Sequence, residues 1–360
     1  MSGQPRTDLL GFDSAGFISW MREQVGYEDR FHRAGYRQLM RTGRWDPAQI
    51  SDWNDAQDPV AARQRLAALA APEQCPELVT HASESDPEHG TTTKLVLRLA
   101  DGREVESVGI PMTKDTHLTA CVSTQVGCRM GCGFCRTARM GLVRNLSAHE
   151  IIGQVIAVER ACHRSVRNVV FMGMGEPLDN IAAVAQAVRV LTDRSGLALA
   201  WNHVTVSTVG RIAALAQVVG HGLNRANLAI SLHAADDAVR AALVPTARRE
   251  RVADLRQALT AIPLPRGRRL MISAVVIPGV TDRPELVAAL AEFCNGLPAL
   301  INLIPFNPFP GCDPTWQMPT TAQMADMSRA INARGIPVRK RTTKGVNVLA
   351  ACGQLATRRR

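Results

Sequence analysis

From about residue 117 onward, short apolar segments alternate with segments in which apolar residues recur at helical spacing. Apolar strands that alternate with amphipathic helices are typical of a parallel sheet with both faces covered. Six or so such units predict an α/β fold, a full or partial barrel whose reactive side chains lie at the carboxyl ends of the strands. We expect strands within residues 117–123, 167–173, 202–209, 226–233, 270–277, 300–306 and 336–341.

Two of the intervening segments carry clear helix signals. Ser147 and Glu150 form a capping box at the start of residues 147–162, where each side chain satisfies a backbone N–H of the first turn. In residues 179–191 the apolar side chains share one helical face, as in a helix that packs on a sheet. They are Ile181, Val184, Val188 and Leu191.

The first part of the chain is organised differently. Residues 14–25 and 58–70 have helical spacing, whereas the polar, proline-containing residues 71–90 indicate a linker. Residues 91–99 and 103–111 resemble strands joined by the turn Ala-Asp-Gly, which predicts a β-hairpin. The expected organisation is an N-terminal helical accessory domain (1–85), a linker with the hairpin (86–115), the barrel (116–345) and a C-terminal segment (346–360).

The chain carries an excess of basic residues. Its 360 residues have a formal net charge of +10 and a pI near 9.6, which favours a polyanionic partner such as nucleic acid. An arginine-rich composition can equally reflect a GC-rich genome. Aromatic residues make up only 4%, so we do not expect base stacking on an aromatic platform to dominate binding.

Neither a membrane segment nor a secretion signal is expected. No apolar run is long enough to span a bilayer, and the first residues lack the basic-then-apolar order of a signal peptide. Nine cysteines without such a signal indicate a reducing compartment, in which cysteines serve as thiols or metal ligands. The expected location is therefore cytoplasmic.

Three cysteines, Cys128, Cys132 and Cys135, follow the first expected barrel strand in the spacing C-x3-C-x2-C. Glycines between them let the backbone fold closely around a bulky centre. Three thiolates suit a [4Fe–4S] cluster with one iron left open for a substrate or cofactor. The alternative is a zinc site with a distant fourth ligand, but zinc sites usually pair two C-x2-C elements, and the sequence has no second pair.

This spacing, with Phe134 before the last cysteine, resembles the radical S-adenosylmethionine (SAM) superfamily, in which the open iron binds SAM. The chain is further similar to the RlmN/Cfr family of RNA methyltransferases, which modify a ring carbon of adenine. The resemblance implies a partial (β/α)6 radical SAM barrel with a small N-terminal helical domain and a connecting β-hairpin. It rests on residues 121–146, 168–180, 228–234, 301–311 and 350–355.

The resemblance implies a mechanism that uses two SAM molecules per turnover. One SAM methylates the thiolate of Cys352, and a second, bound at the cluster, gives a radical that takes a hydrogen atom from that methyl group. The carbon radical adds to adenine, Glu106 removes a proton from the adduct, and Cys121 releases the product and leaves a Cys121–Cys352 disulfide. Without the resemblance, Cys352 would be a buried thiol and Glu106 a solvated carboxylate.

Several residues at the ends of the expected strands are implied to contact SAM. Taken singly, Ser207 and His233 would be ordinary polar groups satisfied within the fold. Four strand ends that converge in one barrel favour a common site instead. The implied SAM residues are Gly175, Glu176, Ser207, Ser231, Leu232, His233 and Asn307.

The implied partners are RNA and an electron donor such as flavodoxin or ferredoxin, with the protein acting as a monomer. The expected RNA is 23S ribosomal RNA, with transfer RNA as a further substrate, and carbons 2 and 8 of adenine both remain open. RNA phosphates are expected to meet the N-terminal domain and the basic segments 247–252, 265–269 and 339–344.

The chain departs from the family pattern at four positions. Ser273 and Ala274 replace an acidic–tyrosine pair, and Asn347 and Leu349 replace acidic or polar residues before Cys352. We therefore expect intact radical chemistry and altered substrate recognition. Two alternatives stay open: the same chemistry on a non-RNA adenine-containing or small aromatic substrate, and a cluster-containing RNA-binding protein without turnover.

Overall fold

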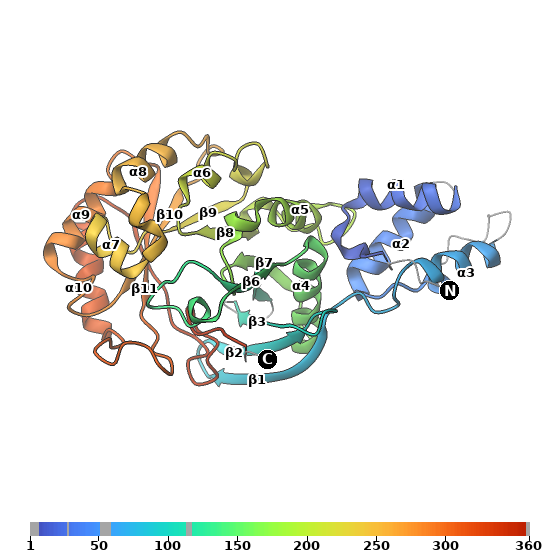
Figure 1. Ribbon diagram of the computed structural model, residues 1–360, viewed down its shortest axis with the longest axis horizontal. Coiled ribbons are helices and arrows are strands. Elements are labelled where there is room, and N and C mark those ends of the chain that lie inside the picture. The colour runs from blue at the N-terminus through green and yellow to red at the C-terminus, as the bar shows by residue number, and fades with distance from the viewer. Residues whose placement is uncertain (1–6, 27–28, 51–58, 113–116, 358–360) are drawn as a thin grey trace.

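The structure is a computed structural model that describes residues 7–26, 29–50, 59–112 and 117–357. The N-terminal region contains helices α1 (Ser14–Val25), α2 (Asp29–Thr42) and α3 (Pro59–Leu69). These helices lie at one end of the molecule, beside α4 and α5 of the barrel (Figure 1). The helices expected within residues 14–25 and 58–70 are confirmed by α1 and α3, apart from residue 58, which lies outside the described residues.

A ten-stranded sheet forms the centre of the molecule, in the order β1-β2-β3-β4-β7-β8-β9-β10-β11-β12. Its first four strands pair in antiparallel fashion: β1 (Glu77–Asp86), β2 (Gly90–Arg98), β3 (Glu104–Pro111) and β4 (Leu118–Cys121). From β4 onward every pairing is parallel. The further strands are β7 (Val166–Phe171), β8 (Val204–Thr208), β9 (Asn227–Ser231), β10 (Leu270–Val276), β11 (Ala299–Pro305) and β12 (Val338–Lys340). Each expected barrel strand and the predicted hairpin are confirmed.

Helices follow the parallel strands in chain order and cover the outer face of the sheet (Figure 1). They are α4 (Ala148–Cys162), α5 (Ile181–Thr192), α6 (Ile212–Leu215), α7 (Asp237–Leu243), α8 (Val252–Thr260), α9 (Pro284–Cys294) and α10 (Thr321–Asn332). The capping box of α4 is present, because Ser147 Oγ accepts from Glu150 N at 3.2 Å and Ser147 N donates to the Glu150 carboxylate at 2.9 Å. None of the described helices combines the length and the apolar character needed to cross a membrane.

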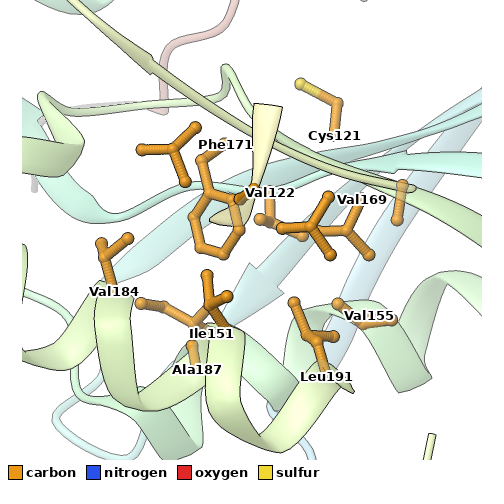
Figure 2. Packing of buried hydrophobic residues seen from close by; sticks show 14 of the residues in the cluster. Cys121, Val122, Ile151, Val155, Val169, Phe171, Val184, Ala187 and Leu191 are labelled. Atoms are coloured by element: carbon orange, nitrogen blue, oxygen red, sulfur yellow. The ribbon is translucent and has the colours of Figure 1, made fainter. Parts of the chain in front are cut away.

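The packing of the barrel on its helices decides which side chains face the interior. Figure 2 shows Val169 and Phe171 of β7 against Ile151 of α4 and Leu191 of α5, all of them buried. Because successive strand residues point to opposite faces, the residues next to this core point the other way. Cys121 is one such residue, and its sulfur points away from the two helices (Figure 2).

Strand β1 corrects one expectation from the sequence. Residues 71–90 were expected to form a linker, but Glu77–Asp86 form a long edge strand that pairs with β2. Almost every side chain of β1 is exposed on both faces, so no apolar alternation marks it as a strand. Its stability comes from the backbone ladder to β2 rather than from burial.

A small second sheet was not anticipated. β5 (Gln125–Cys128) and β6 (Gly141–Asn145) pair in antiparallel fashion and hold the two ends of the loop that carries the cysteines. The pairing is irregular between Val126 and Gly127, and Gly127 has a φ of 75°. A Cβ at Gly127 would lie 1.8 Å from the carbonyl oxygen of Gly141, so only glycine fits at this crossing.

We expect Gly127→Ala to reduce the free energy of unfolding by about 3 kcal/mol or more, because it adds a backbone clash to the strain of a positive φ. Gly102→Ala is the matched control, since Gly102 has a φ of 80° with no atom within 4 Å of an added Cβ. The control should lose only about 1–2 kcal/mol. Urea unfolding of both variants measures the difference, and equal losses would contradict this account of the loop.

Candidate functional site

A cavity lies at the carboxyl ends of the parallel strands and encloses about 1000 Å³ of empty space, counting the part open to solvent. The ends of β7 to β11, the cysteine loop (residues 128–138) and the C-terminal segment (residues 352–355) form its wall. Residues from distant parts of the chain therefore meet at one place. Among them are Cys128, Cys132, Cys135, Gly175, Glu176, Ser207, Ser231, His233, Asn307 and Cys352.

The cysteine loop holds its three thiols in apolar surroundings. Cys135 N donates to Cys132 O at 3.1 Å, and Gly133 N donates to Leu243 O at the end of α7 at 3.0 Å. Burial raises the pKa of Cys128 to about 12 and also raises the pKa values of Cys132 and Cys135. The thiols therefore stay protonated at neutral pH unless a metal stabilises the thiolates.

The placement of these donors tests which metal group fits. A zinc ion with Zn–S bonds of about 2.3 Å needs ligand atoms within about 4 Å of one another. In the part of the chain that the structure describes, no three cysteine, histidine or carboxylate side chains are grouped to hold a single metal ion. A four-iron cluster spreads its thiolate ligands more widely. Three cysteines around an open cavity thus fit a [4Fe–4S] cluster better than a zinc site.

Glu176 follows β7 and is buried between two strand ends. Its Oε1 accepts from Leu178 N at 3.0 Å, and its Oε2 accepts from Val209 N at 2.9 Å. Burial raises the pKa of Glu176 to about 7, although these N–H donors oppose the shift. Gly175 lets the backbone pass closely, since a Cβ there would lie 2.7 Å from that of Gln125. A cationic ligand group would stabilise the ionised form of this carboxylate.

Ser207 and Ser231 end β8 and β9, and their hydroxyl oxygens lie 3.4 Å apart. His233 follows β9 with a φ of 66°, a strained value for a residue other than glycine. Its Nδ1 accepts from Val275 N at 3.2 Å, and its ring centroid lies 4.3 Å from that of Phe134. Burial lowers the pKa of His233 to about 3, so its imidazole is neutral at neutral pH. Through its contacts with Val275 and Phe134, this ring links the strand ends to the cysteine loop.

Asn307, which follows β11, has one satisfied and one unsatisfied polar atom. Its Nδ2 donates to Cys352 O at 3.1 Å. Its Oδ1 is buried and has no hydrogen-bond partner within the described residues. An unpaired buried acceptor is costly, so a ligand that offers an N–H or O–H group would stabilise this wall. The unpaired oxygen fits a polar ligand such as SAM. Leu232, by contrast, is fully buried and does not line the cavity.

The C-terminal segment is fastened to the cysteine loop. Arg136 N donates to Gly353 O at 2.7 Å, and Thr137 Oγ1 donates to Leu355 O at 2.6 Å. Both bonds reach residues that follow Cys352 closely, and they come from the residues directly after Cys135. The position of Cys352 is therefore set by the same loop that carries the three cysteines.

Cys352 also borders a second cavity, with about 470 Å³ of empty space. The residues that the two cavities share are Ile304, Pro305, Asn307 and Cys352. Arg341 and Lys344 line the second cavity but not the first. Cys352 therefore borders both cavities.

Cys121 and Glu106 lie outside the main cavity but close to the C-terminal segment. Burial is the main cause that raises the pKa of Cys121 to about 12, and the neighbouring Cys352 adds to the shift. Glu106 Oε1 lies 3.3 Å from Lys94 Nζ, and its Oε2 accepts from Ala356 N at 2.9 Å. Burial raises the pKa of Glu106, while the Lys94 ammonium opposes that rise.

Sequence reasoning missed Lys94. The hairpin could have indicated it, because β2 pairs with β3 and Val96 of β2 lies opposite Glu106 of β3. Lys94 is two residues before Val96, so its side chain is on the same face of the hairpin as Glu106. Opposite charges at two inward positions of a largely apolar hairpin would have indicated a buried pair.

The four departures from the family pattern lie in different surroundings. Ser273 lines the main cavity, and its Oγ accepts from Asn302 Nδ2 at 3.3 Å. Ala274 is buried in the core on the opposite face of β10. Asn347 is exposed and donates its N–H to Glu84 at 2.7 Å, and Leu349 has a positive φ of 52°. Of the four, Ser273 alone borders the main cavity.

Comparison with known proteins agrees with this geometry. Residues 122–291 match the model of the radical SAM superfamily. The dual-specificity RNA methyltransferase RlmN of Magnetococcus marinus is 38% identical over 98% of this chain and 95% of its own length. The RlmN of Caulobacter vibrioides is 39% identical over 85% of this chain and 76% of its own. A radical SAM methyltransferase structure from Sphaerobacter thermophilus has a TM-score of 0.82 and 33% identity, covering 98% of this chain and 99% of that one.

These similarities extend over almost the whole chain and include the cysteine loop, the strand ends and the C-terminal segment. Radical SAM proteins use a [4Fe–4S] cluster and SAM, and both groups fit the donors and the unpaired polar atom described above. The chain belongs to the RlmN family of the radical SAM superfamily.

Proposed function

We propose that this enzyme methylates a ring carbon of adenine in RNA and that Cys352 carries the methyl group. The observation that supports this most directly is the position of Cys352. It lies in the wall of the cavity lined by the three cysteines, and it borders a second cavity on its other side. A carrier that receives a methyl group from one ligand and passes it to another needs such access to both.

The cluster and SAM supply the radical chemistry when bound, and the chain supplies the site. Cys128, Cys132 and Cys135 would hold the cluster by its three thiolates. Glu176, once ionised, would accept from the SAM ammonium, and Asn307 Oδ1 would gain a partner. Gly175, Ser207, Ser231 and His233 are proposed to shape the rest of the SAM site, and Leu232 to support it from behind the cavity lining.

Cys352 would act first as a nucleophile. Its thiolate takes the methyl group from the sulfonium of one SAM, which forms a thioether and leaves S-adenosylhomocysteine. A hydrogen atom of this methyl group would then pass to the radical that the second SAM supplies when bound at the cluster, and the carbon radical left on Cys352 would add to the adenine. The bonds from Arg136 and Thr137 to the C-terminal segment hold the methyl group in place during both steps.

Glu106 and Cys121 would complete the reaction. Glu106 is proposed to take a proton from the adduct, and its pairing with Lys94 favours the carboxylate form that a base requires. The unpaired electron of the adduct would pass to the cluster when it is bound. The thiolate of Cys121 would then attack the sulfur of Cys352, which breaks the bond between that sulfur and the methylene carbon, lets this carbon take up a proton as the new methyl group, and leaves a Cys121–Cys352 disulfide. Both residues contact or approach the C-terminal segment, as such a sequence needs.

RNA is proposed as the substrate because the relatives named above are dual-specificity RNA methyltransferases and the chain has a net charge of +10. We infer that the RNA substrates are 23S ribosomal RNA and transfer RNA. Exposed arginines in segments 247–252 and 265–269, together with the N-terminal domain (1–85), would contact phosphates. The reductant would be a flavodoxin or ferredoxin, and the enzyme would act as a cytoplasmic monomer.

Mass spectrometry tests the carrier role. We expect a methyl group on the peptide that carries Cys352, and methyladenosine in ribosomal RNA from cells that express the enzyme. Both should disappear in Cys352→Ala and persist in Cys75→Ala, whose thiol is half-buried in the N-terminal region. Nucleoside standards distinguish 2-methyladenosine from 8-methyladenosine. An unmethylated Cys352 in protein with a full cluster and bound SAM would exclude the carrier role, and unmodified RNA would favour another substrate.

The dependence of turnover on pH tests the role of Glu106. A base acts as the carboxylate, so activity should rise as the pH passes the pKa of Glu106. Lys94→Met removes the cation that lowers this pKa, and the acid limb of the kcat profile should therefore move to higher pH. Lys94→Arg should leave the limb close to that of the native enzyme. Methylation of Cys352 should be unchanged in both variants, and an unshifted limb in Lys94→Met would contradict the role of Glu106.

A further inference from the structure

Arg240, on α7, is a fully buried cation that forms no direct ion pair with any carboxylate in the described part of the chain. Its side chain is 1% exposed. Two nearby carboxylates attract it without forming an ion pair with it. Glu250 Oε1 lies 3.3 Å from Arg211 Nε, and its buried Oε2 has no hydrogen-bond partner within the described residues, whereas Asp237 pairs with Arg251 at 3.9 Å. Within the described residues, no ion pair of Arg240 is present. Burial of an unpaired charge reduces the free energy of unfolding, so Arg240 is expected to bring a compensating gain in stability or function.

Part of that gain is structural. Arg240 Nη1 donates to Leu232 O at 2.9 Å and to Ser231 O at 3.2 Å, and Nη2 donates to Val209 O at 2.6 Å. Arg240 thereby holds together the carboxyl ends of β8 and β9, which border the main cavity. Its Nε has no partner within the described residues. Neutral carbonyl groups satisfy the donors of the guanidinium, but they do not cancel its charge.

The cysteine loop is the neighbour that can supply negative charge. The end of α7 is bonded to that loop through Leu243 O and Gly133 N at 3.0 Å. Leu243 also belongs to the same apolar cluster as Cys128 and Cys132. A thiolate at Cys132 would raise the pKa of Arg240, against the effect of burial. The surroundings are apolar, so charges interact there more strongly than in water.

We infer that Arg240 is a positioning residue whose fixed positive charge stabilises the negative charge of the metal-bound cysteine loop. Each electron added to the cluster makes that loop more negative, and a buried cation stabilises the reduced form more than the oxidised form. Arg240 thus favours reduction of the cluster, in addition to holding the ends of β8 and β9. The inference rests on the cluster ligands and is independent of the RNA substrate and of Cys352.

Two substitutions distinguish the effect of the positive charge of Arg240 from that of its hydrogen-bonding geometry. Arg240→Lys keeps the positive charge but loses the planar group that spans both strand ends, whereas Arg240→Gln keeps one donor group and loses the charge. A purely structural role predicts similar effects of the two, because both disturb the bonds to the carbonyl groups. Arg256→Gln is the matched control, since Arg256 also donates to backbone carbonyls, but to those of Phe293 and Asn295 rather than to residues at the ends of β8 and β9.

The measurement is the midpoint potential of the reconstituted cluster, titrated with dithionite and redox mediators and followed by electron paramagnetic resonance, with iron content as a check on loading. We expect a lower potential in Arg240→Gln and values near the native one in Arg240→Lys and Arg256→Gln. Native potential in Arg240→Gln, or equal lowering in the Lys and Gln variants, would overturn the inference.

A second variant leaves Arg240 itself in place. Glu250→Gln removes a negative charge that attracts Arg240, so the surroundings of the cluster become more positive and its potential should rise. An unchanged or lower potential would count against the inference. If Arg240→Gln fails to fold without iron while Arg240→Lys folds, the charge is needed before any thiolate is present, and the inference is likewise overturned.

Discussion

The rest of the site depends on the burial of three thiols at the carboxyl end of a parallel sheet. Water cannot stabilise thiolates at Cys128, Cys132 and Cys135, so the charged forms need a metal. The same apolar surroundings keep the imidazole of His233 neutral and bring the pKa of Glu176 close to neutrality. A charged group in this cavity is therefore stable only when a ligand or a neighbouring side chain of opposite charge balances it.

The C-terminal segment closes this arrangement. Backbone groups of residues 353–356 bond to the cysteine loop on one side and to Glu106 of the hairpin on the other. The segment thereby connects the extra antiparallel strands with the barrel mouth, two parts that are far apart in the chain. The antiparallel extension of the sheet thus contributes the Glu106 carboxylate that holds the segment following Cys352.

Much of this could be predicted from the sequence, because the barrel strands are buried on both faces and read as continuous apolar runs. The position of the cysteines and of the polar strand ends then followed from parallel topology. Strand β1 could not be found, since its side chains are exposed and its bonds lie in the backbone. Arg240 could not be found either, because a lone basic residue in a helix does not reveal the partners that justify its burial. Lys94 was overlooked although the pairing of the hairpin strands places it on the same face as Glu106.

The two-cavity arrangement bears on how a reactive methyl carrier can work at all. A carbon radical reacts with the first suitable group that it contacts, so its target must lie close by. This favours a short transfer over a long movement of the chain. Cys352 lies in the wall shared by both cavities, and Asn307 Nδ2 and the cysteine loop hold its backbone there. In the proposed reaction the carrier therefore stays in place, and the two substrates approach it from opposite sides. In that reaction Arg341 and Lys344, which line the second cavity and not the first, would favour the binding of an anionic nucleotide there.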